Sequence, residues 1–176
     1  MVDLVCAIDL LMDEFVREFG HQVSHRFVTR NFRPREDMEE SELAAGVITL
    51  LFEGYRPAEN EKLAVLRVAV VGQVELQERS QPLDVERAEL QMLAEFRRFV
   101  NGAAGAEWHV MSVGTSHQIE HPFGWFYATC DVGPINLHMV DPDGGHGEME
   151  LLWGMSPKTG PGHELDYRPA EEFFGG

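Results

Sequence analysis

The first hydrophobic pattern along the chain is helical and covers residues 2–19. Apolar side chains recur on one face at Leu4, Ile8, Leu11, Phe15 and Phe19. This spacing of three to four residues is that of one face of an α-helix, and Gly20 follows as a stop signal. The positions between residues 2 and 12 are apolar on most sides, so we expect this helix to be buried on more than one side, with a partner subunit as a candidate for the second.

The next patterns indicate three strands. Residues 21–32 alternate apolar and polar positions, as a short half-exposed strand does, and the charged residues 33–42 follow as a loop. Residues 44–55 form a continuous apolar run that predicts a central strand covered on both faces, and residues 62–78 form a longer, valine-rich one. The connector between these two runs is short, which favours a hairpin.

A second helix begins at Ser80-Gln81-Pro82-Leu83-Asp84, where proline and an acidic residue suit the first turn. Its expected core face consists of Val85, Ala88, Met92, Phe96 and Phe99. The segment NGAAG at 101–105 ends it. Two further strands, residues 107–120 and 124–133, are joined by a turn at residues 121–124 that contains both proline and glycine.

The order of these elements, α-β-β-β-α-β-β, predicts an α+β fold with two helices packed on an antiparallel or mixed sheet. We place this body at residues 1–137. Residues 138–176 are rich in glycine and proline and predict an extended C-terminal arm. The arm carries apolar anchors that are candidates for a protein interface: Leu151, Leu152, Trp153, Tyr167, Phe173 and Phe174.

Length, hydropathy and charge restrict the function classes. The 176 residues fit one domain. No apolar run approaches the roughly 18 residues of a membrane span, and the N-terminus lacks the features of a secretory signal, so we expect a cytoplasmic protein without a membrane partner. The formal net charge of −16 disfavours specific nucleic-acid binding, because such binding depends on cations that displace counterions.

No pattern of side chains predicts a catalytic, metal or cofactor site. His117 and His121 have the spacing of a zinc pair, but we expect them on a strand, where they would lie about 13 Å apart at roughly 3.3 Å per residue. The segment Asp141–Gly145 lacks the ligand spacing of a calcium loop. Cys6 and Cys130 are expected as buried apolar residues. We therefore expect no cofactor and no enzymatic activity.

The layout of the chain resembles the tail terminator proteins of long-tailed phages. The resemblance covers residues 1–137 and rests on the element order and on the strand sequences AAGVITLLFEGYRP and GWFYATCDV. It implies a structural virion protein that forms a ring, as a hexamer, caps the tail tube and joins it to the head. The implied partners are other copies of the chain, the tail tube protein and a head-completion or neck protein, with DNA passing through the ring. The implied location is the tail or neck of the virion, and the host cytoplasm during assembly.

Two other functions stay open at the level of sequence. One is a small soluble enzyme or ligand-binding protein, with a site of scattered aspartate, glutamate and histidine side chains. The other is a cytoplasmic adaptor that binds a protein partner through its C-terminal arm.

Overall fold

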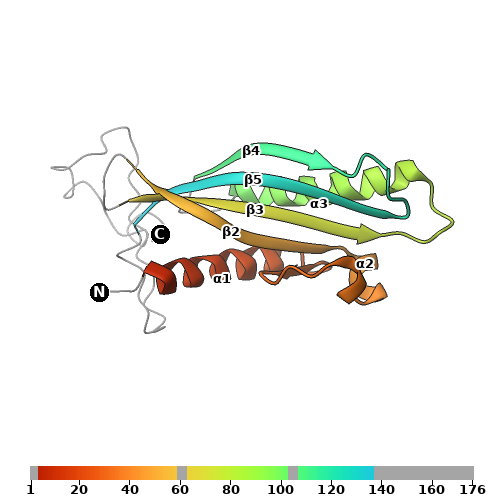
Figure 1. Cartoon of the computed structure of the whole chain (residues 1–176), viewed down its shortest axis with the longest axis horizontal. Coiled ribbons are helices and arrows are strands. Elements are labelled where there is room, and N and C mark those ends of the chain that lie inside the picture. The colour runs from red at the N-terminus through yellow and green to blue at the C-terminus, as the bar shows by residue number, and fades with distance from the viewer. Residues whose placement is uncertain (1–3, 59–62, 103–106, 137–176) are drawn as a thin grey trace, which may run out of the picture. The chain divides into compact units, whose positions relative to one another are not determined.

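Five strands form one mixed sheet in the order β1-β2-β3-β5-β4, and the computed structural model describes residues 4–58, 63–102 and 107–136 of the chain (Figure 1). The strands are β1 (Phe27–Thr29), β2 (Val47–Pro57), β3 (Ala64–Glu75), β4 (Trp108–Thr115) and β5 (Phe123–Ile135). Only β1 and β2 pair in parallel, and the other neighbours are antiparallel. The expected α+β class is confirmed.

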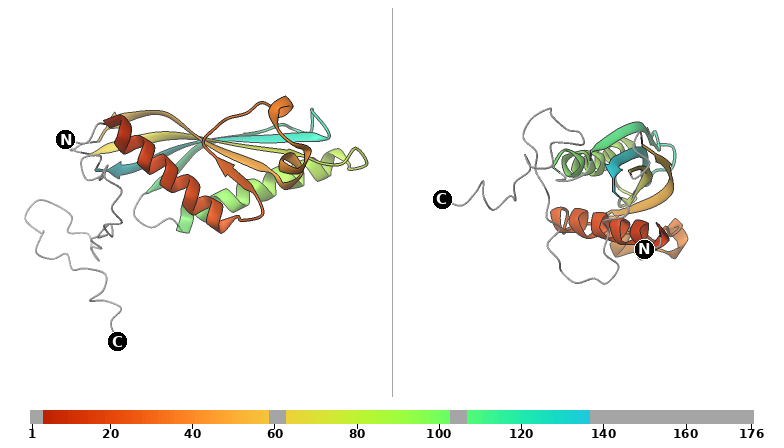
Figure 2. Two further views of the ribbon diagram at one scale, coloured as in Figure 1. Left: turned by 90° about the horizontal axis from the view of Figure 1, so that it is seen from below. Right: turned by 90° about the vertical axis from the view of Figure 1, so that its left-hand side faces the viewer.

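The helices are α1 (Leu4–Gln22), α2 (Glu40–Ala45) and α3 (Pro82–Gly102), with a short 3₁₀ turn, η1, at Arg35–Asp37. α3 lies behind the strands in the view of Figure 1, and α2 lies on the other side of the sheet (Figure 2, left). The chain order matches the sequence expectation apart from α2. That helix forms in the segment expected to be a charged loop, because Glu39 and Glu42 build a capping box and Leu43 is buried.

The main core lies between the sheet and the helices α1 and α3. Aromatic rings from both helices pack together near Trp108, the first residue of β4. The Phe19 and Phe99 rings stack with centroids 4.9 Å apart, and the Phe15 ring contacts Trp108 edge-on at 5.0 Å. Burial of such side chains is the largest stabilising contribution that the fold has. The expected core faces of both helices are therefore largely confirmed.

In this core the Phe126 ring of β5 packs directly against the backbone of β3 at Gly72. Gly72 pairs with Phe126 in the sheet, and both residues face the helices. A Cβ atom at position 72 would collide with the Phe126 ring. Only glycine leaves room for the ring to lie flat over the neighbouring strand.

Three expected boundaries are wrong. α1 does not stop at Gly20 but runs to Gln22, because Phe19 and Val23 on either side are both buried and their packing outweighs the weak helix propensity of glycine. The first strand shrinks to Phe27–Thr29, because the chain before it turns so that Arg26 reaches α3. β4 ends at Thr115, and the residues after it form turns rather than strand.

The second apolar side of α1 is not buried within the described part of the chain. Val5, on that side, is 64% exposed, whereas Ala7 and Met12 on the core side are fully buried. That a partner covers this side stays a prediction. None of the helices in the described residues combines the length and the apolar character that crossing a bilayer requires.

Candidate functional site

The outermost strand of the sheet on one side, β4, exposes apolar side chains. Met111 is 59% exposed, and Val110 and Val113 are exposed beside it. The pairing with β5 shifts register between Val110 and Ser112, so that Met111 bulges out of the ladder. Val110 pairs with Cys130 and Val113 with Ala128, both of which belong to the core. We call these three residues the β4 edge; they continue the apolar layer of the core out to the border of the sheet.

The opposite border of the sheet also exposes apolar side chains, which are aromatic. Phe27 lies in β1, Phe52 lies in β2, and Phe32 lies in the loop after β1; all three are exposed. We call this group the β1–β2 side. Because β1 and β4 are the two ends of the strand order, the two apolar surfaces lie on opposite borders of one subunit.

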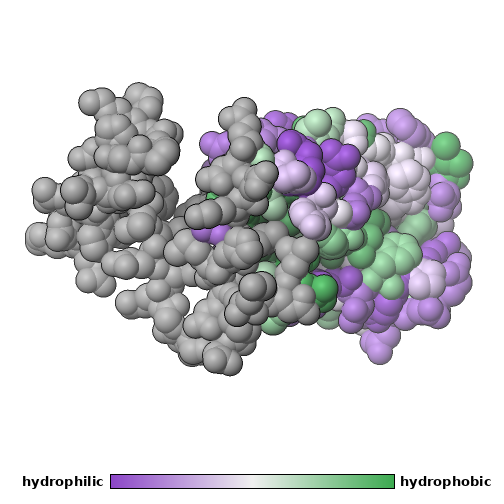
Figure 3. Space-filling view, turned by 60° about the vertical axis from the view of Figure 1, so that its left-hand side comes forward, coloured by the Kyte–Doolittle hydropathy of each residue, from purple (hydrophilic) through white to green (hydrophobic). Residues whose placement is uncertain are grey.

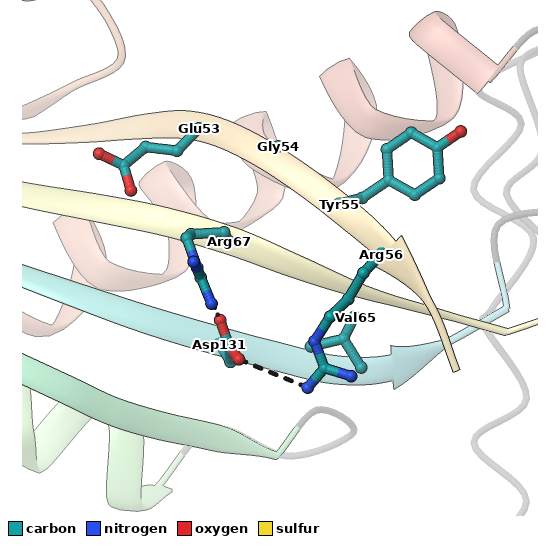
Figure 4. A pocket seen from close by; sticks show the side chains of 7 residues that line it. All are labelled: Glu53, Gly54, Tyr55, Arg56, Val65, Arg67 and Asp131. Atoms are coloured by element: carbon teal, nitrogen blue, oxygen red, sulfur yellow. Dashed lines mark hydrogen bonds and ion pairs between the residues drawn. The ribbon is translucent and has the colours of Figure 1, made fainter. Parts of the chain in front are cut away.

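The face of the sheet that points away from α3 carries a polar hollow of about 200 Å³ at the end where β2 finishes (Figure 4). Its lining residues are Glu53, Gly54, Tyr55, Arg56, Val65, Arg67 and Asp131. We call it the arginine hollow. Two guanidinium groups from adjacent strands share one carboxylate there: Arg67 Nε donates to Asp131 Oδ1 over 3.0 Å, and Arg56 Nη2 reaches Oδ2 over 3.5 Å.

The charges of the hollow perturb the protonation of its members. The hydrogen bond from Arg67, together with the charges of both arginines, holds the pKa of Asp131 below its ordinary value. The same bond raises the pKa of Arg67. Beside the hollow, the Tyr127 hydroxyl donates to Glu53 over 2.6 Å, which raises the pKa of Tyr127. Asp131, Arg67 and Tyr127 therefore keep their ordinary charge states at neutral pH.

A second ion pair, which joins Arg26 just before β1 to Glu95 on α3, is buried. Arg26 donates from Nε to Glu95 Oε2 over 2.8 Å and from Nη2 to Oε1 over 3.1 Å, and its Nη1 donates to the carbonyl oxygen of Ala45 over 2.7 Å. Burial by itself would raise the pKa of Glu95, but the hydrogen bonds and charge of Arg26 outweigh it and lower that pKa. The pair ties the start of β1 and the end of α2 to α3, which is a structural role.

The turn after β4 holds the histidines that sequence analysis weighed as a zinc pair. His117 and the residue after it adopt positive φ angles, so His117 is not on a strand as expected. His121 Nε2 lies 2.9 Å from the carbonyl oxygen of Ser80. Among the described residues no group of three or more His, Cys, Asp or Glu side chains is placed to hold a metal ion.

Glu89 on α3 is a buried carboxylate, so the prediction from the sequence pattern that it lies on the outward, solvated face of this helix is wrong. Its Oε1 accepts hydrogen bonds from the hydroxyl of Ser116 and from the backbone N–H of Trp125, the latter over 3.0 Å. Its Oε2 is buried without a partner among the described residues. A Cβ atom on Gly124 would press against this carboxylate, so the glycine gives α3 and β5 their close approach. We assign Glu89 to the anchoring of the turn after β4.

Both carboxylates of the arginine hollow have hydrogen-bond donors. Asp131 accepts from Arg67 and Arg56, and Glu53 accepts from the Tyr127 hydroxyl. The Cys130 thiol is fully buried, and this burial raises its pKa to about 12. Cys130 thus matches the expectation of a buried, unreactive thiol, whereas Cys6, expected to be buried as well, is only partly buried.

Several predicted residues cannot be placed. The interface candidates of the arm lie outside the described residues: Leu151, Leu152, Trp153, Tyr167, Phe173 and Phe174. Conversely, the sequence analysis missed the arginine hollow. The sequence feature that could have indicated the hollow is a single charged residue within each of two apolar strand segments, Arg67 in LAVLRVAVV and Asp131 in ATCDVG. Charges at such positions find each other when the strands pair.

The side of the molecule shown in Figure 3 carries a band of hydrophobic side chains with hydrophilic areas on both sides of it. Comparison of the sequence with known protein families and with characterised proteins gives no match.

Proposed function

We propose that the chain is a ring-forming virion assembly protein, of the tail terminator kind, that caps a tail tube and joins it to the head. The observation that carries the proposal is the pair of exposed apolar surfaces on opposite borders of one sheet. The β4 edge ends the sheet on one side and the β1–β2 side ends it on the other.

Surfaces of this kind favour contact between copies. An edge strand offers unpaired backbone groups, and proteins that stay monomeric usually guard it with lysine, proline or an inward charge. On the β4 edge the side chains of Val110, Met111 and Val113 are apolar instead. When this edge meets the β1–β2 side of the next copy, the contact is head-to-tail, and such contacts generate rings where the rotation closes.

Charge supports the same proposal. With a formal net charge of −16, a ring of these subunits presents a surface to which DNA does not adhere. This property suits a passage through which DNA moves from head to tail. The partners in this proposal are other copies of the chain, in a ring of six, the tail tube protein and a neck protein. The location is the tail or neck of the virion, reached from the host cytoplasm during assembly.

The mass of the purified protein tests ring formation. Native mass spectrometry and light scattering of the full chain are expected to show a closed oligomer, and electron microscopy is expected to show rings. The double substitution Met111→Lys and Val113→Lys places two charges on the β4 edge and is expected to yield monomers. The control is Leu90→Lys, since Leu90 is also exposed but lies on α3.

Binding to tail tubes tests the second half of the proposal. Purified tubes that still elongate are mixed with the protein, and capping is expected to stop elongation with density at one tube end. A wild-type protein that is monomeric at every concentration and leaves elongation unchanged would contradict the proposal. Oligomers that are equally abundant in the edge variant would contradict the role of the β4 edge.

A further inference from the structure

We propose that the arginine hollow is a docking site for a carboxylate side chain in an acidic segment of another protein. The hollow lies where β2 extends past the end of β1, so it adjoins Phe52 of the β1–β2 side but consists of polar and charged side chains on one face of the sheet. The inference does not depend on the proposed function.

The arrangement of the arginines favours an oxyanion ligand. Asp131 engages Arg67 through Nε, and within the described residues neither terminal nitrogen of Arg67 has a hydrogen-bond partner. Arg56 is held only by a long contact of 3.5 Å to the same carboxylate, and its side chain is mostly exposed. Asp131 thus orients two guanidinium groups whose remaining donors face the hollow (Figure 4). Paired N–H donors in this geometry suit a carboxylate, which accepts two parallel hydrogen bonds.

The geometry of the donors, rather than net charge, favours a carboxylate. The hollow contains two arginines and two acidic residues, Glu53 and Asp131, so its formal charges cancel. A guanidinium presents parallel N–H donors that match the two oxygens of a carboxylate, and competition with acetate and with phosphate separates the two ligand classes.

Size and lining favour a side chain of a protein over a free metabolite. About 200 Å³ in an open hollow is smaller than the roughly 300–1,000 Å³ of pockets that enclose small-molecule ligands. The side chains that face the hollow beside Asp131 are those of Arg56 and Arg67, and arginine is one of the residue types that dominate binding energy at protein interfaces (Figure 4). The Tyr55 side chain points to the other face of the sheet, because Tyr55 pairs with the core residue Leu66. A space beside Gly54, where a Cβ atom would meet nothing within 4 Å, leaves the backbone of a partner room to approach.

Fluorescence anisotropy of a labelled peptide tests the proposal on the full chain. The probe is a short peptide with a central Glu-Glu pair, and its counterpart carries Gln-Gln. The acidic peptide is expected to bind saturably, and Arg67→Ala or Arg56→Gln is expected to weaken that binding at least tenfold. Arg98→Ala serves as the matched control, since Arg98 is an exposed arginine on α3, and is expected to leave binding within twofold of wild type.

Each other outcome has a defined meaning. Arg56→Gln keeps the test valid if loss of Arg67 disturbs the fold, because the Arg56 side chain is mostly exposed and circular dichroism can confirm that the variant is folded. Absence of saturable binding, equal binding of the Gln-Gln peptide, or an unchanged affinity in both folded variants would overturn the proposal. Stronger displacement of the peptide by inorganic phosphate than by acetate would also overturn the assignment to a carboxylate. None of these results bears on ring formation, which is measured by mass on the β4-edge variants.

Discussion

Replacement of Glu95 by leucine should destabilise the protein more than any loss of an exposed ion pair. Arg26 and Glu95 have side chains that are only 8% and 7% exposed. In Glu95→Leu the guanidinium of Arg26 stays buried but loses the carboxylate, and it keeps its hydrogen bond to the carbonyl oxygen of Ala45. Removing one partner of a buried pair costs about 3–5 kcal/mol, a large share of the roughly 5–15 kcal/mol by which a domain is stable.

Removal of both charges should cost far less. In Arg26→Met with Glu95→Leu no charge is left buried, and apolar side chains of similar length occupy the space. Such replacements are often close to neutral. The double variant should therefore recover most of the stability lost in Glu95→Leu, with a coupling energy at the upper end of the roughly 0.5–3 kcal/mol found for residues in contact.

Urea unfolding followed by tryptophan fluorescence measures these differences. With a slope of about 1–3 kcal/mol per molar urea, Glu95→Leu should lower the midpoint by roughly 2 M. Arg87→Ala is the control, because Arg87 pairs with Asp84 on the exposed surface of α3, and exposed pairs contribute only about 0.2–1 kcal/mol. If Glu95→Leu cost no more than Arg87→Ala, or if the double variant were as unstable as the sum of its parts, our assignment of a buried and coupled pair would be wrong.

Three further predictions follow from other parts of the structure. Gly72→Ala should destabilise the fold by about 1–3 kcal/mol through overpacking against Phe126, and Phe126→Leu in the same chain should relieve part of this loss, as urea midpoints would show. Folding lowers the pKa of Glu95 and of Asp131, so these two carboxylates stabilise the folded state fully above their unfolded pKa near 4. This stabilisation is lost as the pH falls through the lower folded pKa. Urea midpoints measured from pH 7 to pH 2 should therefore decrease in that window, and less steeply in Glu95→Gln. Iodoacetamide at pH 8 should modify Cys6 and spare Cys130 until the protein is unfolded, as mass spectrometry of the two peptides would show, because Cys130 is buried with a pKa of about 12.

Local patterns predicted the elements well where one periodicity dominates. The apolar spacing of α1 and α3, and the valine-rich runs of β2 and β3, lead directly to the observed layers. The errors occur where a contact distant in sequence decides the local structure. Arg26 lies outside the strand predicted for it because its side chain donates to the carboxylate of Glu95 on α3. The capping box at Glu39 favours a helix over a loop only when Leu43 is also buried against the rest of the fold.

The candidate site was harder to foresee for the same reason. Arg56, Arg67 and Asp131 come from three strands, and their meeting depends on the register of β2 with β3 and of β3 with β5. A shift of one residue in either pairing would send the side chains to the other face. The bulge at Met111 is likewise a property of pairing, and nothing in the local sequence of β4 marks it.

The proposed association of copies through the β4 edge would make the apparent stability of the protein a function of its concentration. Val110 and Val113 extend the core layer to the border of the sheet, so one subunit alone leaves part of its hydrophobic layer in water. If copies bind each other only in the folded state, mass action adds the free energy of association to that of folding. The melting temperature of the wild-type chain then rises with protein concentration, while that of the Met111→Lys and Val113→Lys variant stays constant.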